Sequence, residues 1–325
     1  MVLSIFNRVA CSAAVLLVVV GAGMATGRAL GQAPADNQVA VSDTATVSPL
    51  LRQHDILRQQ IAGAVSFEAK VAGPIVAEHP LMPVLRYALE THGKLAATVR
   101  DYTCRLAKRE RIDGRLMLHE VIEVKLRQPG VLPTGSPVPM SVYMKWLAPN
   151  KIEGREVVWT QGKNYSNLMA TKGGEGNLKT FTLTVPLKSP RAMERTRYPI
   201  SEIGMLNLAE RLIQDGVKHM ELDGRRECQV RVAEGAKIDG RVCRYIEVVF
   251  PVQREGIRFH KAQIFVDQQL AMPVRYAAYS WPTQSGGESP LLEEFTYVNV
   301  KLNVGLTDQD FNPKNPAYKF FVPEE

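Results

Sequence analysis

Two stretches near the start of the chain place apolar residues at the spacing of an amphipathic helix. Ser48 followed by Pro49 is a typical helix start, because serine caps free N–H groups and proline fits the first turn. The apolar residues that recur on one face of this helix are Leu50, Leu57, Ile61 and Val65. A second helix is predicted over 82–100, with inward residues Leu85, Leu89, Ala96 and Val99.

From Tyr102 onward the apolar period changes from helical to two, which indicates β-strands. Tyr102, Cys104 and Leu106 share one face, and Asp113 with Gly114 forms a hairpin turn. The apolar positions of the next strand are Leu116, Leu118, Ile122, Val124 and Leu126. In the strand after it, Met140, Val142, Met144 and Trp146 alternate with more polar residues. Short strands follow at about 156–160, 165–170 and 180–185.

One predicted helix interrupts the strands in the second half of the chain. Residues 201–220 place Ile203, Leu206, Ala209, Ile213 and Val217 on one side. Strands resume at about 227–232, 242–250, 261–266, 273–279 and 291–298. About eleven strands and three helices predict an α+β fold with a largely antiparallel sheet. We expect a single domain over 48–325, which includes the N-terminal helices.

The N-terminus has the order of features found in secretory signal peptides. An apolar stretch follows Arg8, and the small residues Gly23 and Ala25 stand where a signal peptidase requires them. We therefore expect 1–25 to be a signal peptide and 26–47, small and polar, to be a flexible linker. The mature protein would be periplasmic or secreted in a bacterium. The alternative is that the apolar stretch stays uncleaved as a membrane anchor.

Composition and charge narrow the classes of partner. Of the 325 residues, 45% are hydrophobic and 22% charged, which is typical of a folded soluble domain. The net charge of +7 favours anionic partners, including a membrane surface. The basic residues are spread along the chain, so no nucleic-acid footprint is localised and no nucleic-acid partner is expected.

The motifs that normally carry catalysis are not found in the sequence. It has no nucleophile elbow, no phosphate-binding loop and no Cys-Xaa-Xaa-Cys. Residues 119–123 resemble a zinc-protease motif, but the second histidine is replaced by Glu123, and the alternation predicts a strand. The six histidines show no ligand spacing, so neither a metal nor a cofactor is expected. We therefore expect a protein that is not an enzyme.

Three cysteines remain once the signal peptide is removed, and the odd number leaves at least one thiol unpaired within the chain. Cys228 and Cys243 flank a turn at Asp239 and Gly240 and could form a disulfide across a hairpin. Their alternation places them on unlike faces unless a bulge near residues 234–236 restores the register. The sequence leaves the bridge open.

The strands carry more large apolar residues than a thin antiparallel sheet requires. One interpretation is that these residues pack as an ordinary core under the helices. The other is a curved sheet whose concave face, covered by the helices, holds an apolar ligand, with the 201–220 helix as lid. The residues expected to line such a cavity are Met144, Trp146, Trp159, Phe181, Leu183 and Leu206.

Several blocks, in the same order, resemble a bacterial family of exported proteins of unknown function, DUF1571. They lie at residues 101–104, 108–110, 143–146, 154–157, 197–204 and 297–308. The layout of strands is more remotely similar to the periplasmic lipoprotein-carrier (LolA/LppX-like) superfamily. This similarity implies an incomplete β-barrel of about eleven antiparallel strands, with helices covering the concave face.

The sequence therefore supports two functions. The first is an exported, non-enzymatic binding protein whose apolar cavity takes acyl chains or lipid-modified partners. The alternative is a periplasmic protein-binding sensor or scaffold module in which the sheet is fully packed.

We expect the mature protein to begin at Thr26, because cleavage after Ala25 follows the small residues of the signal peptide. N-terminal sequencing of the exported protein tests this. An intact Met1 in membrane fractions would instead show an uncleaved anchor, and a cytoplasmic location would contradict both versions.

Overall fold

The computed structural model of the chain describes residues 48–72, 78–173, 182–223 and 227–322. The predicted signal peptide at 1–25 and linker at 26–47 lie outside these residues. None of the described helices has the length and apolar character needed to span a bilayer. The helices are α1 (Pro49–Ala72), α2 (Met82–Thr98), α3 (Pro190–Met193) and α4 (Met205–Leu222), with 3₁₀ turns η1 (Asn164–Ser166), η2 (Ile200–Glu202) and η3 (Asp308–Phe311).

The sheet confirms the predicted α+β fold class. Its strands are β1 (Asp101–Ile112), β2 (Arg115–Leu116), β3 (Glu120–Arg127), β6 (Ser141–Ala148), β7 (Glu156–Thr160), β8 (Leu168–Thr171), β9 (Thr182–Val185), β10 (Gln229–Ile238), β11 (Arg241–Val249), β12 (Lys261–Asp267), β13 (Met272–Tyr279) and β14 (Leu291–Leu302). A separate small hairpin joins β4 (Gly130–Val131) and β5 (Pro137–Val138).

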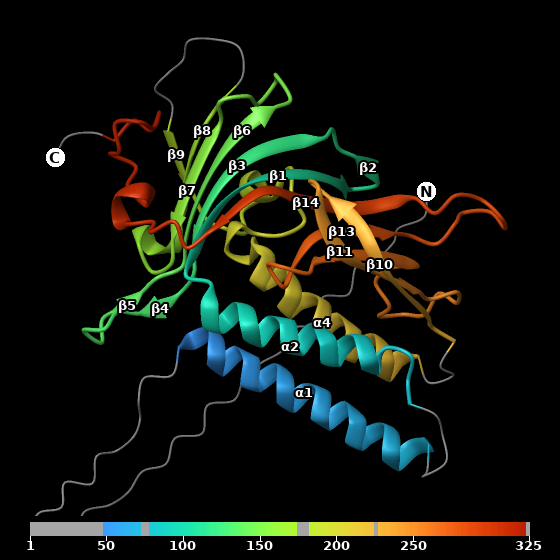
Figure 1. The fold of residues 1–325 in the computed structure, drawn as a ribbon. Helices are drawn as coiled ribbons and strands as arrows, with labels where there is room; N and C mark the ends of the chain where they lie inside the picture. The colour runs from blue at the N-terminus through green and yellow to red at the C-terminus, as the bar shows by residue number, and fades with distance from the viewer. Residues whose placement is uncertain (1–47, 73–77, 174–181, 224–226, 323–325) are drawn as a thin grey trace, which may run out of the picture. The chain divides into compact units, whose positions relative to one another are not determined.

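All strands of the large sheet pair antiparallel, and the sheet does not close. The strand order is β10-β11-β12-β13-β14-β1-β3-β6-β7-β8-β9, with β2 paired to β1 alone. Among the described residues β9 and β10 are the two ends, and each has one strand neighbour. The sheet is strongly curved, and α2 and α4 lie on its inner side (Figure 1). This is the incomplete barrel expected from the sequence.

Three helices stack on one half of the sheet. α2 and α4 contact each other and β13, while α1 packs mainly on α2 and α4 (Figure 1). Leu57 and Ile61 of α1 are buried as predicted, but Val65 is 42% exposed and Ala64 is buried in its place. The buried stripe of α1 therefore continues three residues after Ile61 and not four, since both spacings lie on the same face of a helix.

The helix predicted at 201–220 begins later and ends later than expected. Residues 200–202 form η2, and Gly204 then adopts a φ of +114°, which only glycine takes readily. The N–H of Met205 donates to the hydroxyl of Tyr102, 3.2 Å away and almost wholly buried in β1. The first residue of α4 is thereby fixed to the middle of the sheet.

The predicted hairpin from β1 to β3 is present with one difference. Asp113 and Gly114 both have positive φ, which is the turn geometry that Asp-Gly favours. Leu118, predicted to face the core, is 55% exposed because residues 117–119 lie outside any strand. Strand β6 also differs from the prediction. Tyr143 packs against Phe311 of a C-terminal segment, so both faces of β6 are covered.

His219, near the end of α4, is an uncharged residue of the packed core. It is 1% exposed, its Nε2 accepts from the N–H of Arg258 at 3.2 Å, and the rings of Phe250 and Phe259 meet it edge-on. Burial lowers its pKa from 6.5 to about 4. The nearby charged groups have smaller effects on this pKa than burial has. Asp215 raises the pKa, whereas Arg258 and Lys218 lower it.

This burial predicts a pH-dependent stability. Between pH 6.5 and about 4 the unfolded chain binds a proton on His219 that the folded chain excludes, so the free energy of unfolding falls as the pH falls. The loss is at most about 3 kcal/mol. His219→Gln keeps a hydrogen-bond acceptor but cannot titrate, so its stability should decrease less between pH 7 and pH 4.5 in denaturant titrations.

His119→Gln is the matched control, because the side chain of His119 is 61% exposed. It should show the full wild-type loss. Equal pH dependence in wild type and in His219→Gln would contradict the assignment.

Candidate functional site

A cavity of about 650 Å³ lies between the inner face of the sheet and the segment 186–204. We call this segment, which runs from the end of β9 to the start of α4, the roof. The apolar sheet residues that line the cavity are Leu106, Met144, Trp146, Val157, Leu168, Ala170, Leu183, Val185, Phe295 and Tyr297. The apolar roof residues are Leu187, Ala192, Pro199, Ile200 and Ile203. Most of the lining is therefore aliphatic or aromatic.

The structure brings three of the six predicted cavity residues together. Met144, Trp146 and Leu183 line the cavity. Trp159 lies on the same face of β7 as Val157 but two residues further along the strand, outside the cavity lining. It is buried in the core, with 5% exposed, and its indole N–H donates to the carbonyl of Ser166 at 3.2 Å. Leu206 is also buried in the core, outside the lining. Phe181 lies outside the described residues.

The predicted lid is wrong in its main element. Only Leu208 and Arg211 of α4 line the cavity, and most of the helix packs on α2 and β13. The cover is the roof instead, which is irregular apart from the four residues of α3 and the turn η2. The sequence pattern favoured the 201–220 helix as the lid, because the roof has no apolar periodicity from which a covering element could be predicted.

The other half of the sheet is packed. Beneath α2 and α4 the hollow is only about 80 Å³, lined by side chains such as Leu85, Ile246 and Ile264. Close packing of this kind is the norm for protein interiors. Among the described residues, the sheet is therefore packed at β11–β13 and hollow at β6–β9.

Two buried carboxylates tie the roof to β1 and β3. Glu120 of β3 accepts from the indole Nε1 of Trp146 at 2.8 Å, and its other oxygen pairs with Arg195 of the roof at 2.8 Å. Glu110 of β1 pairs with Lys108 at 2.6 Å and accepts from the N–H of Arg197. Glu110 and Glu120 are 1% and 2% exposed, so these contacts replace all of their hydration.

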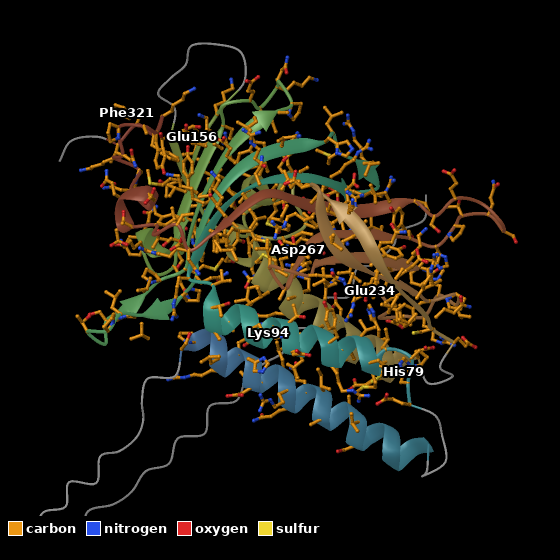
Figure 2. All side chains as sticks on the ribbon, viewed as in Figure 1. His79, Lys94, Glu156, Glu234, Asp267 and Phe321 are labelled. Carbon is orange, nitrogen blue, oxygen red and sulfur yellow. The ribbon has the colours of Figure 1, made fainter. Side chains whose placement is uncertain are left out.

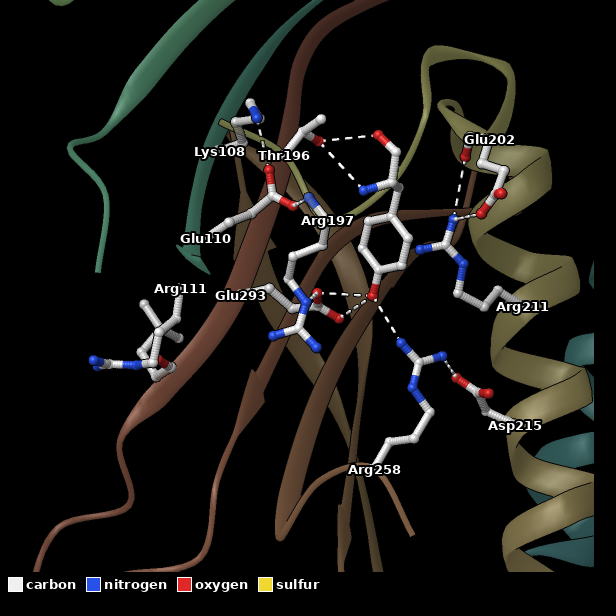
Figure 3. Close-up of polar contacts among 12 residues, drawn as sticks. Lys108, Glu110, Arg111, Thr196, Arg197, Glu202, Arg211, Asp215, Arg258 and Glu293 are labelled. Carbon is white, nitrogen blue, oxygen red and sulfur yellow. Dashed lines mark hydrogen bonds and ion pairs between the residues drawn. The ribbon is translucent and has the colours of Figure 1, made fainter. Parts of the chain in front are cut away.

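A third buried carboxylate, Glu293 of β14, holds the middle of the roof (Figure 3). The hydroxyl of Tyr198 lies 2.8 Å from both of its oxygens, and Arg197 lies 3.1 Å from one of them. Arg258 donates to the same hydroxyl and pairs with Asp215 of α4 at 2.7 Å. Burial, followed by the charge of Glu293, raises the pKa of Tyr198 to about 12, so this phenol stays a proton donor to the carboxylate.

The polar side chains of the lining are those of lysine, arginine, glutamate, threonine and tyrosine. Among the described residues, the lining contains no serine, cysteine, histidine or aspartate. Of the groups that hold the roof, Lys108, Glu120, Arg195 and Tyr198 reach the lining, and each has a partner within the fold.

Four residues of this network were not expected from the sequence, although the strand pattern contains a signal for them: Lys108, Glu110, Glu120 and Glu293. Lys108 and Glu110 continue the inward positions that Leu106 begins on β1. Glu120 likewise precedes Ile122 on the inward face of β3, and Glu293 precedes Phe295 and Tyr297 on β14. A charged residue at an inward position of a strand must be paired, so the alternation alone could have marked these residues as a buried network.

The possible disulfide between Cys228 and Cys243, which the sequence left open, is not formed in the structure. Cys243 lies opposite Ala236, whereas Cys228 precedes Gln229, which lies opposite Val249. The bulge between Ala233 and Ala236 exists as expected, but it leaves the two cysteines about seven residues apart along the hairpin, or roughly 23 Å. This distance far exceeds the ~7 Å that a disulfide spans. All three cysteines of the described chain are free and buried.

A buried trio of His79, Asp223 and Cys228 has donor atoms within 4.8 Å of one another. His79 precedes α2 (Figure 2). The N–H of Leu81 donates to its Nδ1 at 3.1 Å, so a neutral ring carries its proton on Nε2, 3.4 Å from Asp223. A metal ligand needs a lone pair on that nitrogen, and Asp223 is already engaged by Arg254. We therefore interpret the trio as a hydrogen-bonded contact between structural elements and not as a metal site.

We expect Glu120→Gln to destabilise the fold, because it removes the charge that Lys108 and Arg195 share. Breaking a buried ion pair costs about 3–5 kcal/mol, and we expect the low end because Arg195 is one quarter exposed. Denaturant unfolding measures this. Glu123→Gln is the control, since Glu123 lies on the outer face of the same strand and its side chain is 47% exposed. Equal stability of the two variants would show that the network does not anchor the roof.

Comparison with known proteins gives one family and several distant folds. Similar solved structures include a DUF1329 family protein from Desulfovibrio piger, at 12% identity and a TM-score of 0.35, covering 72% of this chain and 98% of that one. The MucA/MucB complex of Pseudomonas aeruginosa is also similar, at 12% identity and a TM-score of 0.39, with 71% of this chain and 60% of that one covered. A putative outer membrane lipoprotein-sorting protein domain from Vibrio parahaemolyticus matches at 10% identity and a TM-score of 0.32, with 70% of this chain and 95% of that one covered.

Likeness at this level carries no inference about function. None of the curated proteins matches the sequence. Residues 99–320 match the model of a family described as "Protein of unknown function (DUF1571)". This match covers β1 to η3, the cavity and the roof, which is more than half of the chain. The protein therefore belongs to the DUF1571 family.

Proposed function

We propose that this protein is an exported, non-enzymatic binding protein whose cavity holds the acyl chain of a lipid or of a lipid-modified partner. The observation that carries the proposal is the mostly apolar hollow of about 650 Å³ under the roof. This volume lies within the ~300–1,000 Å³ that small-molecule sites occupy. Native cores seldom contain voids much larger than a water molecule, so a hollow of this size favours a ligand site.

The lining fits a flexible chain better than a rigid polar ligand. Met144, Leu168, Leu183 and Leu187 offer aliphatic surface from three strands and the roof. Burying an acyl chain against such surface contributes about 25 cal/mol for each Å² removed from water. Methionine adds adaptability, because its unbranched side chain follows ligands of different shape. The acyl chain therefore supplies the affinity without a directional contact.

The proposed location is the periplasm or the exterior of a bacterial cell, reached by the signal peptide expected at 1–25. Acyl chains and lipid-modified proteins are poorly soluble, so a protein that shields them has a use in an aqueous compartment. The excess of basic over acidic residues also suits brief contact with an anionic membrane surface.

We expect the purified protein to bind a fluorescent long-chain fatty-acid analogue, and Ala170→Trp to weaken this binding by at least about tenfold. Ala170 lines the cavity on β8, so an indole there fills space that the probe needs. Fluorescence titration measures the affinity.

Thr184→Trp is the matched control. Thr184 lies on β9 opposite Met169 and is exposed on the outer face, whereas its neighbour Leu183 lies opposite Ala170 and lines the cavity. This variant should bind like the wild type. No binding by the wild type, or equal loss in both variants, would overturn the proposed function.

A further inference from the structure

Positive charges gather at one end of the cavity. Arg155 precedes β7, Lys172 follows β8, and Arg191 and Arg195 belong to the roof, yet all four line the cavity. The Nε of Arg155 donates to the carbonyl of Lys172 at 3.3 Å. The start of β7 and the roof therefore bring the charges of Arg155, Arg191 and Arg195 near one another, and Lys172 lines the same cavity at the adjacent end of β8.

Within the part of the chain that the structure describes, most of this charge has no counterpart. Arg195 pairs with Glu120, and the other cavity cations, Lys108 and Arg211, have carboxylate partners of their own. Among the described residues, Arg155, Lys172 and Arg191 form no ion pair, and the remaining carboxylate of the lining is that of Glu194. Three cations face one carboxylate, an excess of two positive charges.

Arg155 is the cation placed to meet a ligand that fills the cavity. Its guanidinium carbon lies 6.0 Å from the centre of the Trp146 ring, which itself forms part of the apolar lining. Stacking on an aromatic face orients the plane of a guanidinium. Only its Nε is engaged in a hydrogen bond with a described residue, so the Nη donors remain available.

The surroundings of Arg155 are unfavourable to its charge when the cavity is empty. Burial is the largest effect that lowers its pKa, and the nearby cations Arg195 and Arg191 lower it further. Glu120 and Glu194 act in the opposite direction without cancelling these effects. An anion bound here would relieve the repulsion among like charges that are held together in a partly desolvated place.

We infer that the cavity selects amphiphiles with an anionic head, which Arg155, Lys172 and Arg191 bind while the acyl chain lies on the apolar lining. This inference rests on the proposed function and names the chemistry of its ligand. The forked N–H donors of a guanidinium match two oxygens of one head, which a carboxylate or a phosphate monoester supplies and an alcohol does not. The charge gives selectivity, and the chain gives affinity.

The test compares three ligands that share a twelve-carbon chain: laurate, dodecyl phosphate and dodecanol. Titration calorimetry on the mature protein should show that laurate or dodecyl phosphate binds at least about tenfold more tightly than dodecanol, because only the anions pair with the cations. The anion that binds more tightly identifies the head as a carboxylate or a phosphate.

Arg155→Gln should bring the affinity for the anions to within about twofold of that for dodecanol, while dodecanol binding stays unchanged. Arg191→Gln should reduce the preference as well, and because Arg191 is exposed this variant keeps the fold. Arg115→Gln is the control of equal charge, since Arg115 is exposed on β2 and outside the lining, and it should keep the full preference.

The outcomes separate the two proposals. If dodecanol and the anions bind the wild type equally, or if Arg155→Gln and Arg191→Gln both keep the preference of the wild type, the anionic-head inference is wrong and the acyl-binding function stands. If none of the three ligands binds to the folded wild type, the proposed function itself fails.

Discussion

Three carboxylates buried on three different strands hold the roof at a fixed height above the sheet. Glu110, Glu120 and Glu293 are each at most 4% exposed, and each finds its partners on the roof or beside it. Removing a carboxylate from water is costly unless its charge is paired and its oxygens accept hydrogen bonds. The roof cannot slide into the hollow without breaking these pairs. The same contacts that attach the roof therefore keep the cavity open.

The curved sheet serves two purposes because its two halves are covered differently. α2 and α4 are regular helices, so their apolar stripes can interdigitate with the strands β11–β13 and exclude voids. The roof is mostly irregular, and its backbone cannot present such a stripe to β6–β9. Its side chains meet the sheet at charged contacts instead of along a continuous apolar face. A cavity remains where the helices end.

Apolar and charged groups then divide the cavity between them. Met144 and Leu183 belong to a surface that gives affinity to any chain, whereas Arg155 and its neighbours discriminate by charge. Trp146 connects the two parts, since its indole lines the cavity, donates to Glu120 and lies under the guanidinium of Arg155. A ligand that filled the hollow would touch the anchoring network of the roof through Trp146 and through Glu120 and Tyr198, which also line the cavity. Ligand binding and roof stability are thus physically linked.

The sequence by itself determined the local elements, because apolar periodicity is a property of neighbouring residues. The alternation of Tyr102, Cys104 and Leu106, the turn at Asp113 and Gly114, and the helical spacing around Leu57 all agree with the structure. The α+β class and the number of strands follow from the same signal. Where such signals are strong, the tertiary structure changed only single positions, such as Val65 and Leu118.

Only the tertiary structure decided the site, because the site depends on register and on contacts between distant segments. The pairing of Cys243 with Ala236 separated two cysteines that the sequence could have joined. Trp159 shares the face of Val157, yet its place along the strand puts it in the core and Val157 in the cavity. Arg155, Lys172 and Arg191 converge through the pairing of β7 with β8 and the path of the roof. Alternation fixes which face a side chain occupies, but only the assembled sheet fixes what lies opposite it.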